Sequence, residues 1–303
     1  MKFRSLTHVS IGLCLVRRRS FSPKVPLESI LGQDCWDGDI NYYTCCHTGD
    51  SIYGNDDCWN EEFSYFSCCL FDSLENQDAQ LIFGKYDVAK KSGHDISDHL
   101  DNLRVFAARV MHITQFGVRG FVSTWAFLQG LSDFGTSSGL ENRKSLISYD
   151  IMRFSRRMTT ELTTLGDRVN IAIVFHEKDV LSLSIDKTDL LFIDTFHARG
   201  QLIRELALHS ARVRKYIIMH DTTTYGEESS CAEEASACTE NGRDCSDYCG
   251  TLDGWSDEDR LGGLWHAVEL FLRRNSEWRL LHRYKQNNGL TILERVAPEP
   301  YLK

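Results

Sequence analysis

Short apolar runs alternate with amphipathic stretches along the last two thirds of this chain. Five of the runs have the length of a strand and are bounded by turn residues: HITQFG (112–117), SLISYD (145–150), VNIAIVF (169–175), DLLFID (189–194) and KYIIMHD (215–221). Runs that are apolar throughout are typical of strands buried on both faces, as in a parallel sheet covered by crossover helices. The pattern therefore predicts five parallel strands.

Helices and a terminal hairpin complete this pattern. Stretches with helical spacing of apolar residues precede, separate or follow the runs at 96–110, 121–131, 199–210 and 261–275. Ser97 is placed to cap the first helix. Residues 278–296 predict a hairpin, and Asn288-Gly289 within it suits a type I′ turn. We therefore expect an α/β fold, a doubly wound and mostly parallel sheet with an antiparallel C-terminal hairpin.

Composition narrows the class of protein. The chain has 303 residues, a net charge of −9 and a hydrophobic fraction of 42%. The negative charge argues against nucleic acid as a partner, because nucleic-acid-binding proteins favour basic patches. No apolar run approaches the roughly 18 residues of a membrane span. We expect a globular protein, and its oligomeric state stays open.

The cysteines form two clusters. Of 11 cysteines, six lie between Cys35 and Cys69 and four between Cys231 and Cys249. Even numbers in short segments predict disulfides formed within each cluster, in an oxidising compartment. The second cluster lies in a polar, acidic insertion at 222–260, which directly follows the fifth strand. We expect this insertion to overhang the ligand edge as a lid.

The first cluster contains an internal repeat. CWDGDINYYTCC (35–46) matches CWNEEFSYFSCC (58–69) at both ends. We assign residues 28–75 to this Cys-rich twin-repeat module, which is too small to fold without cross-links. A disulfide-held spacer, a carbohydrate-binding module that uses Trp36 and Trp59, and a zinc site remain open. Adjacent Cys-Cys pairs lack the usual zinc spacing.

The first residues look like a targeting segment. Residues 1–27 contain six basic residues and no acidic one, around the apolar core VSIGLCLV. A signal peptide, with a secretory or extracellular location, is the preferred interpretation. An organellar transit peptide is the alternative, because RRRS follows the apolar core.

Polar residues and glycines follow the predicted strands. The first strand runs into a turn that contains Gly117 and Gly120, and a helix begins near Ser123. Glycines let a backbone approach a ligand closely, and a helix N-terminus favours polar or anionic groups. A tight turn without a ligand explains the same pattern.

Two acids follow the next strands. Asp150 can accept hydrogen bonds from ribose hydroxyls, and Asp179 can face an adenine amine. The alternative for each is a helix cap.

This series resembles the class I S-adenosylmethionine-dependent methyltransferases. The segments FGVRG-VSTWAFLQGL, DLLFIDTFHARGQLIREL, KYIIMHDTT and NNGLTILERV are similar to a metal-dependent branch, the cephalosporin-hydroxylase-like and catechol-type enzymes. The resemblance covers about residues 95–297 and implies a methyltransferase-like domain at 76–303. It implies S-adenosylmethionine as cofactor, with Gln115, Gly117, Gly120, Ser123, Asp150 and Asp179 as its binding residues. The family usually has an acid where this chain has Gln115.

The resemblance also implies a metal site. In the metal-dependent branch, an Asp after the fourth strand and two polar residues after the fifth hold a divalent cation, which places Asp194, His220 and Asp221 at that site. Carboxylates suit Mg²⁺, and a histidine shifts the preference toward Mn²⁺, Fe²⁺ or Zn²⁺. His197 would be the general base. The alternatives are that His220 and Asp221 only tie down the lid, and that His197 begins a helix and faces solvent.

The sequence thus favours methyl transfer to a hydroxyl oxygen, assisted by Mg²⁺ or Mn²⁺. A secreted binding protein with a degenerate methyltransferase domain is the first alternative. A nucleotide-binding enzyme of different chemistry on the same sheet is the second, because a fold does not fix a function.

Overall fold

The computed structural model describes Cys45 and residues 55–58, 77–133, 143–232 and 254–296. The predicted targeting segment at 1–27, most of the twin-repeat module including both of its tryptophans, and residues 233–253 of the insertion lie outside the described residues. The domain boundaries therefore stay predictions. None of the described helices is both long enough and apolar enough to cross a membrane.

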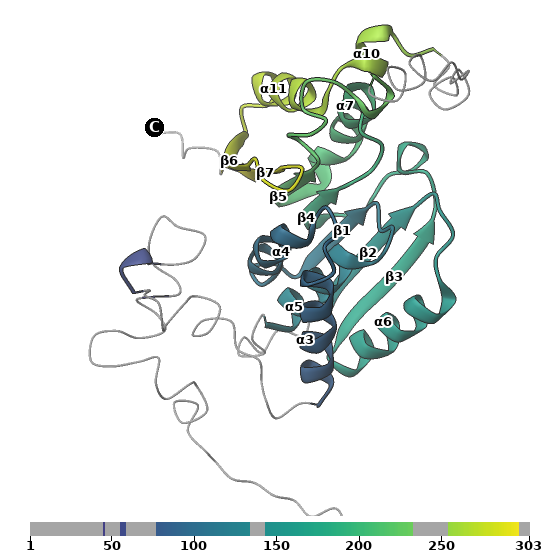
Figure 1. Cartoon of the computed structure of the whole chain (residues 1–303), viewed down its shortest axis with the longest axis vertical. Coiled ribbons are helices and arrows are strands. Elements are labelled where there is room, and N and C mark those ends of the chain that lie inside the picture. Colours follow the sequence, from purple (N-terminus) through teal and green to yellow (C-terminus); the bar gives the residue numbers. More distant parts are fainter. Residues whose placement is uncertain (1–44, 46–54, 59–76, 134–142, 233–253, 297–303) are drawn as a thin grey trace, which may run out of the picture.

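A seven-stranded sheet forms the centre of the molecule (Figure 1), with the order β3-β2-β1-β4-β5-β7-β6. The strands are β1 (His112–Phe116), β2 (Lys144–Asp150), β3 (Ile171–Glu177), β4 (Thr188–Ile193), β5 (Val213–His220), β6 (Trp278–Tyr284) and β7 (Leu290–Arg295). Strands β1 to β5 pair in parallel, whereas β7 is antiparallel to both β5 and β6. The predicted fold class, a doubly wound and mostly parallel sheet with an antiparallel C-terminal hairpin, is confirmed.

Helices cover both faces of the sheet. They are α3 (Gln77–Lys90), α4 (Leu100–Ala107), α5 (Val122–Asp133), α6 (Arg156–Arg168), α7 (Arg199–His209), α10 (Asp257–Leu261) and α11 (Leu264–Arg274). Side chains from α3, α4, α5 and α6 pack in one hydrophobic cluster, and those from α7 and α11 pack in another. Alternate residues of one strand serve the two clusters: Leu190 and Phe192 of β4 join the first, and Leu191 and Ile193 join the second. This alternation explains why the strands read as continuous apolar runs.

Two local predictions were wrong. Ser97 does not cap α4, because it lies in a short 3-10 helix, η3 (Ser97–His99), where its hydroxyl donates to the Ala89 carbonyl. The hairpin turn is centred one residue earlier than expected. Asn287 and Asn288 both have positive φ, and Gly289 N–H donates to Gln286 C=O. A positive φ at both central residues is the feature of a type I′ turn, so asparagines supply it here.

The described cysteines are cross-linked. Cys45 and Cys58 form a disulfide that joins the end of the first repeat to the start of the second. Cys231, at the start of the second cluster, is also disulfide-bonded. Cys45 and Cys58 agree with the predicted pairing within a cluster, and the pairing of the remaining cysteines lies outside the described residues.

Candidate functional site

The carboxyl ends of β1, β2, β4 and β5 meet at one edge of the sheet. The neighbours β1 and β4 lead to crossovers on opposite faces, and such a switch point is where ligands bind in open α/β sheets. Two backbone bonds join the loops there: Asp194 N–H donates to Phe116 C=O at 2.9 Å, and Gly117 N–H donates to Tyr149 C=O at 3.0 Å.

The two predicted glycines differ in their surroundings. Gly117 has φ +77°, and a Cβ atom there would lie 1.8 Å from the backbone oxygen of Asp194. Gly120 has no such constraint, because its Cβ would meet only the Val122 side chain at 3.8 Å. The fold itself therefore requires Gly117, whereas the expected ligand approach at Gly120 stays a prediction.

Gln115 lies in a fully buried polar network. Its amide nitrogen donates to Ser123 Oγ at 2.9 Å and to Gly117 C=O at 3.2 Å. Its amide oxygen accepts from the hydroxyls of Thr124 and Ser148, each at 3.1 Å. An amide offers two donors and two acceptor positions, so all four are used. Direct contact of Gln115 with the cofactor would cost one of these bonds, and Ser123 is likewise engaged.

Asp150 braces the glycine turn. Its Oδ2 accepts from the backbone N–H groups of Val118 at 2.8 Å and Arg119 at 3.2 Å, and its Oδ1 accepts from Met152 N–H at 2.8 Å. A carboxylate has about four acceptor positions, so one remains for a ligand. The predicted ribose contact stays a prediction, restricted to Oδ1.

Asp179 acts as the cap that the alternative interpretation proposed. Its Oδ1 accepts from Leu181 N–H at 2.9 Å, at the start of the short 3-10 helix η5 (Val180–Ser182). The side chain is exposed, and its predicted role toward an adenine stays a prediction.

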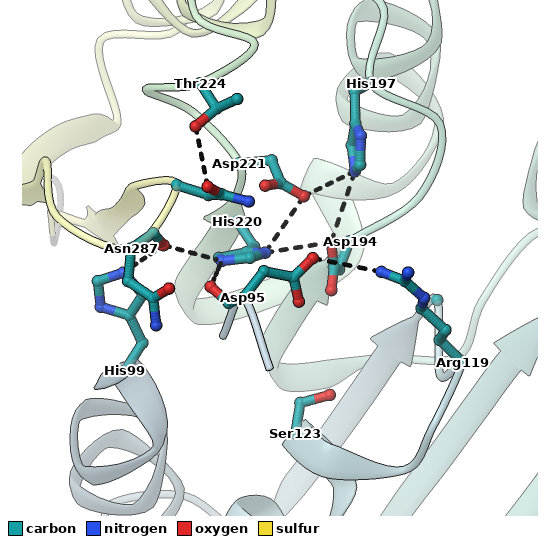
Figure 2. A network of polar contacts seen from close by, with 12 residues as sticks. Asp95, His99, Arg119, Ser123, Asp194, His197, His220, Asp221, Thr224 and Asn287 are labelled. Carbon is teal, nitrogen blue, oxygen red and sulfur yellow. Dashed lines mark hydrogen bonds and ion pairs between the residues drawn. The ribbon is translucent and has the colours of Figure 1, made fainter. Parts of the chain in front are cut away.

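Four predicted residues converge where β4 and β5 end (Figure 2). His197 Nε2 lies 2.8 Å from Asp221 Oδ2 and 3.7 Å from Asp194 Oδ1. His220 Nδ1 lies 3.3 Å from Asp221 Oδ2 and 3.4 Å from Asp194 Oδ1. Strand pairing explains the convergence, because β4 and β5 are adjacent and parallel. We call these four residues the Asp–His cluster.

The cluster perturbs the pKa of each member. Burial alone would lower the pKa of both imidazoles, but hydrogen bonds and charge from Asp194 and Asp221 outweigh it. They raise the pKa of His197 to about 9 and that of His220 to about 10. Burial alone would raise the pKa of both carboxyls, and the hydrogen bonds from the two histidines instead lower it. Without a bound cation, the cluster therefore consists of two ionised carboxylates and two positively charged imidazoles, whose charges cancel.

The same atoms suit a divalent cation. One ligand atom each from Asp194, His197 and Asp221 lies within 4.8 Å of the others. The second oxygen of Asp221, Oδ1, is buried and has no hydrogen-bond partner, and the residue has φ 60°. An unpartnered buried oxygen and a left-handed backbone are both costly, and such costs concentrate at functional sites. His197 is thus a candidate ligand beside Asp194 and Asp221, whereas the sequence assigned the metal site to Asp194, His220 and Asp221.

His220 is held in place from behind. Its Nε2 lies 3.1 Å from the backbone oxygen of Asp95 and 3.4 Å from that of Asn287, so a proton on Nε2 directs Nδ1 to the carboxylates (Figure 2). The side chain has no solvent exposure, whereas that of His197 is 25% exposed. The alternative that His197 only faces solvent does not match its contact with Asp221.

The insertion begins and ends against the cluster. Tyr225 stacks on His197, with ring centroids 4.6 Å apart, and Ser230 N–H donates to His197 C=O at 3.0 Å. The end of the insertion returns to the same place, where Arg199 Nη1 lies 2.6 Å from Asp259 Oδ1. Both described ends of the predicted lid therefore lie beside α7, and the predicted covering by its centre stays a prediction.

Sequence reasoning missed Glu205 on α7. Its side chain is fully buried, and Oε1 accepts from Thr195 Oγ1 at 2.7 Å and Gln201 Nε2 at 2.8 Å. Burial raises the pKa of this carboxyl to about 7. A signal existed in the sequence, because Gln201, Glu205 and His209 recur at four-residue spacing beside Leu202 and Leu206. Those leucines face the core, so the polar stripe beside them is buried too.

Comparison with protein-family models and with curated protein sequences finds no match. Solved structures with a similar arrangement exist. A proposed O-methyltransferase from Klebsiella pneumoniae is 13% identical over 73% of this chain and 91% of its own, with a TM-score of 0.45. A Corynebacterium glutamicum protein is 12% identical over 75% and 94%, with a TM-score of 0.45. An SAH-bound methyltransferase from Podospora anserina is 13% identical over 71% and 88%, with a TM-score of 0.38. Likeness at this level concerns the course of the chain alone, and the fold assignment rests on the strand order.

Proposed function

We propose that this protein transfers a methyl group from S-adenosylmethionine to a hydroxyl oxygen of a small molecule or glycan, with a divalent cation at the Asp–His cluster. The observation that carries the proposal is the contact between the two predicted subsites. The glycine turn that would receive the cofactor packs directly on Asp194, since a Cβ atom on Gly117 would lie 1.8 Å from the Asp194 oxygen. A methyl donor and a cation-bound hydroxyl would therefore be brought close together, as a direct displacement requires.

The cluster supplies the charge that such a cation needs. Asp194 and Asp221 would contribute carboxylate oxygens, and His197 and His220 would contribute imidazole nitrogens. A bound cation would lower the pKa of a substrate hydroxyl, so that its oxygen becomes a better nucleophile. Because His197 Nε2 points at the carboxylates, we assign His197 to the ligands rather than to general-base catalysis. Mixed nitrogen and oxygen ligands favour Mn²⁺, Fe²⁺ or Zn²⁺ over Mg²⁺.

The remaining residues would shape the site. Asp150 keeps the turn at Val118 and Arg119 in place through its backbone bonds, and it retains one acceptor position for the cofactor. Tyr225, on the described start of the insertion, covers one face of the His197 ring and limits access of water to it.

A second candidate is a binding protein whose sheet domain has lost catalysis. The saturated network around Gln115 favours it, because this residue stands where the family usually supplies a negative charge to the cofactor. In this case the cysteine-rich segments would carry the function. We also propose that the protein enters the secretory pathway, because its cysteines occur in even-numbered clusters. An organellar location through a transit peptide is the alternative.

Titration calorimetry tests the proposal. Wild-type protein should bind S-adenosylmethionine, should bind Mn²⁺, and should transfer labelled methyl groups to at least one compound in a panel of hydroxylated small molecules and glycans. Asp194→Asn should lose Mn²⁺ binding and transfer while it keeps the cofactor. Asp189→Asn is a matched control at the opposite end of β4, where Asp189 accepts from Met111 and His112 N–H.

The outcomes separate the candidates. If the protein binds the cofactor and still transfers methyl groups fully after its divalent cations are chelated, the reaction does not need a metal. Absence of cofactor binding in the wild-type protein would refute methyl transfer and favour the binding protein. Equal loss of Mn²⁺ binding in both variants would point to general destabilisation rather than to a metal ligand.

A further inference from the structure

The two imidazoles of the Asp–His cluster are supported unequally. His220 has its outer nitrogen fixed, because Nε2 lies 3.1 Å from the Asp95 carbonyl oxygen. His197 directs Nε2 at the carboxylates, so its outer nitrogen is Nδ1. In the described part of the chain, Nδ1 of His197 makes no hydrogen bond. A histidine that binds a metal almost always donates its other ring N–H to a carboxylate, a carbonyl or a water molecule.

Glu205 lies near this histidine, and one of its two carboxylate oxygens is unpartnered. Its Oε1 is bound by Thr195 and Gln201, whereas Oε2 is buried and has no partner. A buried carboxylate oxygen without a partner is costly, and it needs a water molecule, an ion or a function to account for it.

Both residues line one small cavity. His197, Glu205, Asp194 and His220 all line it, together with apolar side chains such as Leu202 and Leu264. It offers about 10 Å³ to the centre of a water molecule. This is about the least space that holds one water, which also needs two or more polar partners. Glu205 and the members of the cluster that line the cavity are the side chains that can supply these partners.

We propose that Glu205 is a positioning residue of the metal site, which holds His197 in its ligating orientation through one water molecule in this cavity. Nδ1–H of His197 donates to the water, and the water donates to Oε2 of Glu205. A proton kept on Nδ1 leaves the Nε2 lone pair free for a cation. Through Oε1, Glu205 also anchors Thr195 and thus the turn that carries Asp194 and His197. This inference rests on the metal site of the proposed function.

Mn²⁺ titration of four proteins tests the inference. Glu205→Leu removes both oxygens and should weaken Mn²⁺ binding by about 10- to 100-fold, the usual effect of removing an outer-sphere partner. Glu205→Gln keeps an acceptor for Thr195 and should fall between Glu205→Leu and the wild type. Asp189→Asn, which changes another buried acid at the far end of β4, should bind Mn²⁺ within about twofold of the wild type.

A double variant and a spectrum separate positioning from mere stability. If Glu205 acts mainly through His197, Glu205→Leu should cost clearly less Mn²⁺ affinity in a His197→Ala background than in the wild type. In imidazole ¹H–¹⁵N spectra of the protein with diamagnetic Zn²⁺, His197 should be in the Nδ1–H form in the wild type and should lose it in Glu205→Leu. Unchanged Mn²⁺ affinity in folded Glu205→Leu, or additive losses in the double variant, would overturn the inference and leave the metal site intact. A wild-type protein that binds no Mn²⁺ would instead refute the metal site itself.

Discussion

Replacing Gly117 by alanine tests the contact between the predicted cofactor-binding turn and the proposed metal site at Asp194. The added methyl group would lie 1.8 Å from the backbone oxygen of Asp194, and no side-chain rotation can relieve that overlap. Forcing the chain to relax costs ~1–3 kcal/mol, and a left-handed φ adds ~1–2 kcal/mol for a residue with a Cβ atom. We therefore expect Gly117→Ala to lower the free energy of unfolding by ~2–5 kcal/mol, a shift of about 10 °C in Tm for a domain of this size. The shift of Asp194 should also weaken Mn²⁺ binding.

Gly120→Ala is the matched control, because its methyl group would meet only the Val122 side chain at 3.8 Å and its φ is not left-handed. Its free energy of unfolding should stay within about 1 kcal/mol of the wild type. Urea unfolding followed by circular dichroism measures both variants, and calorimetry measures their ligands. A Gly117→Ala protein as stable as the wild type would refute the contact with Asp194. If Gly120 marks a close ligand approach, Gly120→Ala should weaken S-adenosylmethionine binding alone, and unchanged affinity would refute that role.

Three further predictions concern single groups. Asp150→Ala should weaken S-adenosylmethionine binding by ~1–3 kcal/mol and also lower Tm, because Val118 and Arg119 N–H lose their acceptor. Calorimetry measures the affinity. An unchanged affinity with a lowered Tm would show that Asp150 only stabilises the turn and does not bind the cofactor. Burial raises the pKa of Glu205 from 4.5 to about 7, and the charge of Asp179 adds to this while that of His197 opposes it. The folded chain thus keeps a proton that the unfolded chain loses, and stability should fall by ~3 kcal/mol as pH rises from about 4.5 to 7. Metal-free Glu205→Gln should lack this slope in urea titrations, and an identical slope in both proteins would contradict the shifted pKa. Mass mapping of non-reduced peptides should show disulfides among the cysteines of each cluster. Free thiols or bound zinc throughout would contradict this pairing and indicate that the protein resides in a reducing compartment.

The order and the kind of the elements could be predicted from the sequence because they depend on local periodicity. Continuous apolar runs such as DLLFID indicate strands buried on both faces, and both ends of each run fall within two residues of the strand in the structure. Parallel pairing then brings the carboxyl ends of β4 and β5 to one edge. The meeting of Asp194 with His220 and Asp221 therefore followed from the sequence as well, although 26 residues separate Asp194 from His220.

The sequence could not show which polar atoms are already bonded to the chain. Gln115 and Asp150 occur at positions suited to a cofactor, yet Thr124, Ser148 and the backbone of the turn take most of their hydrogen-bonding capacity. Such partners lie on other elements, so their contacts exist only after those elements pack. The same reason explains why the turn of the hairpin is centred one residue from its expected place: register is fixed by pairing with β5 and β6, and not by the turn residues alone.

Only the tertiary structure decided where the side chains of His197 and Glu205 lie. His197 could have faced solvent at the start of α7, but packing against Tyr225 and the two carboxylates turns its Nε2 inward. Glu205 reads in the sequence as an ordinary helix former, yet α7 buries it behind the cluster and leaves Oε2 unpartnered. The sequence determined which strand ends meet, because that follows from periodicity and parallel pairing. The orientation of each side chain and its contacts depend on atoms that folding brings together from distant parts of the chain. The local sequence pattern contains no information about those atoms.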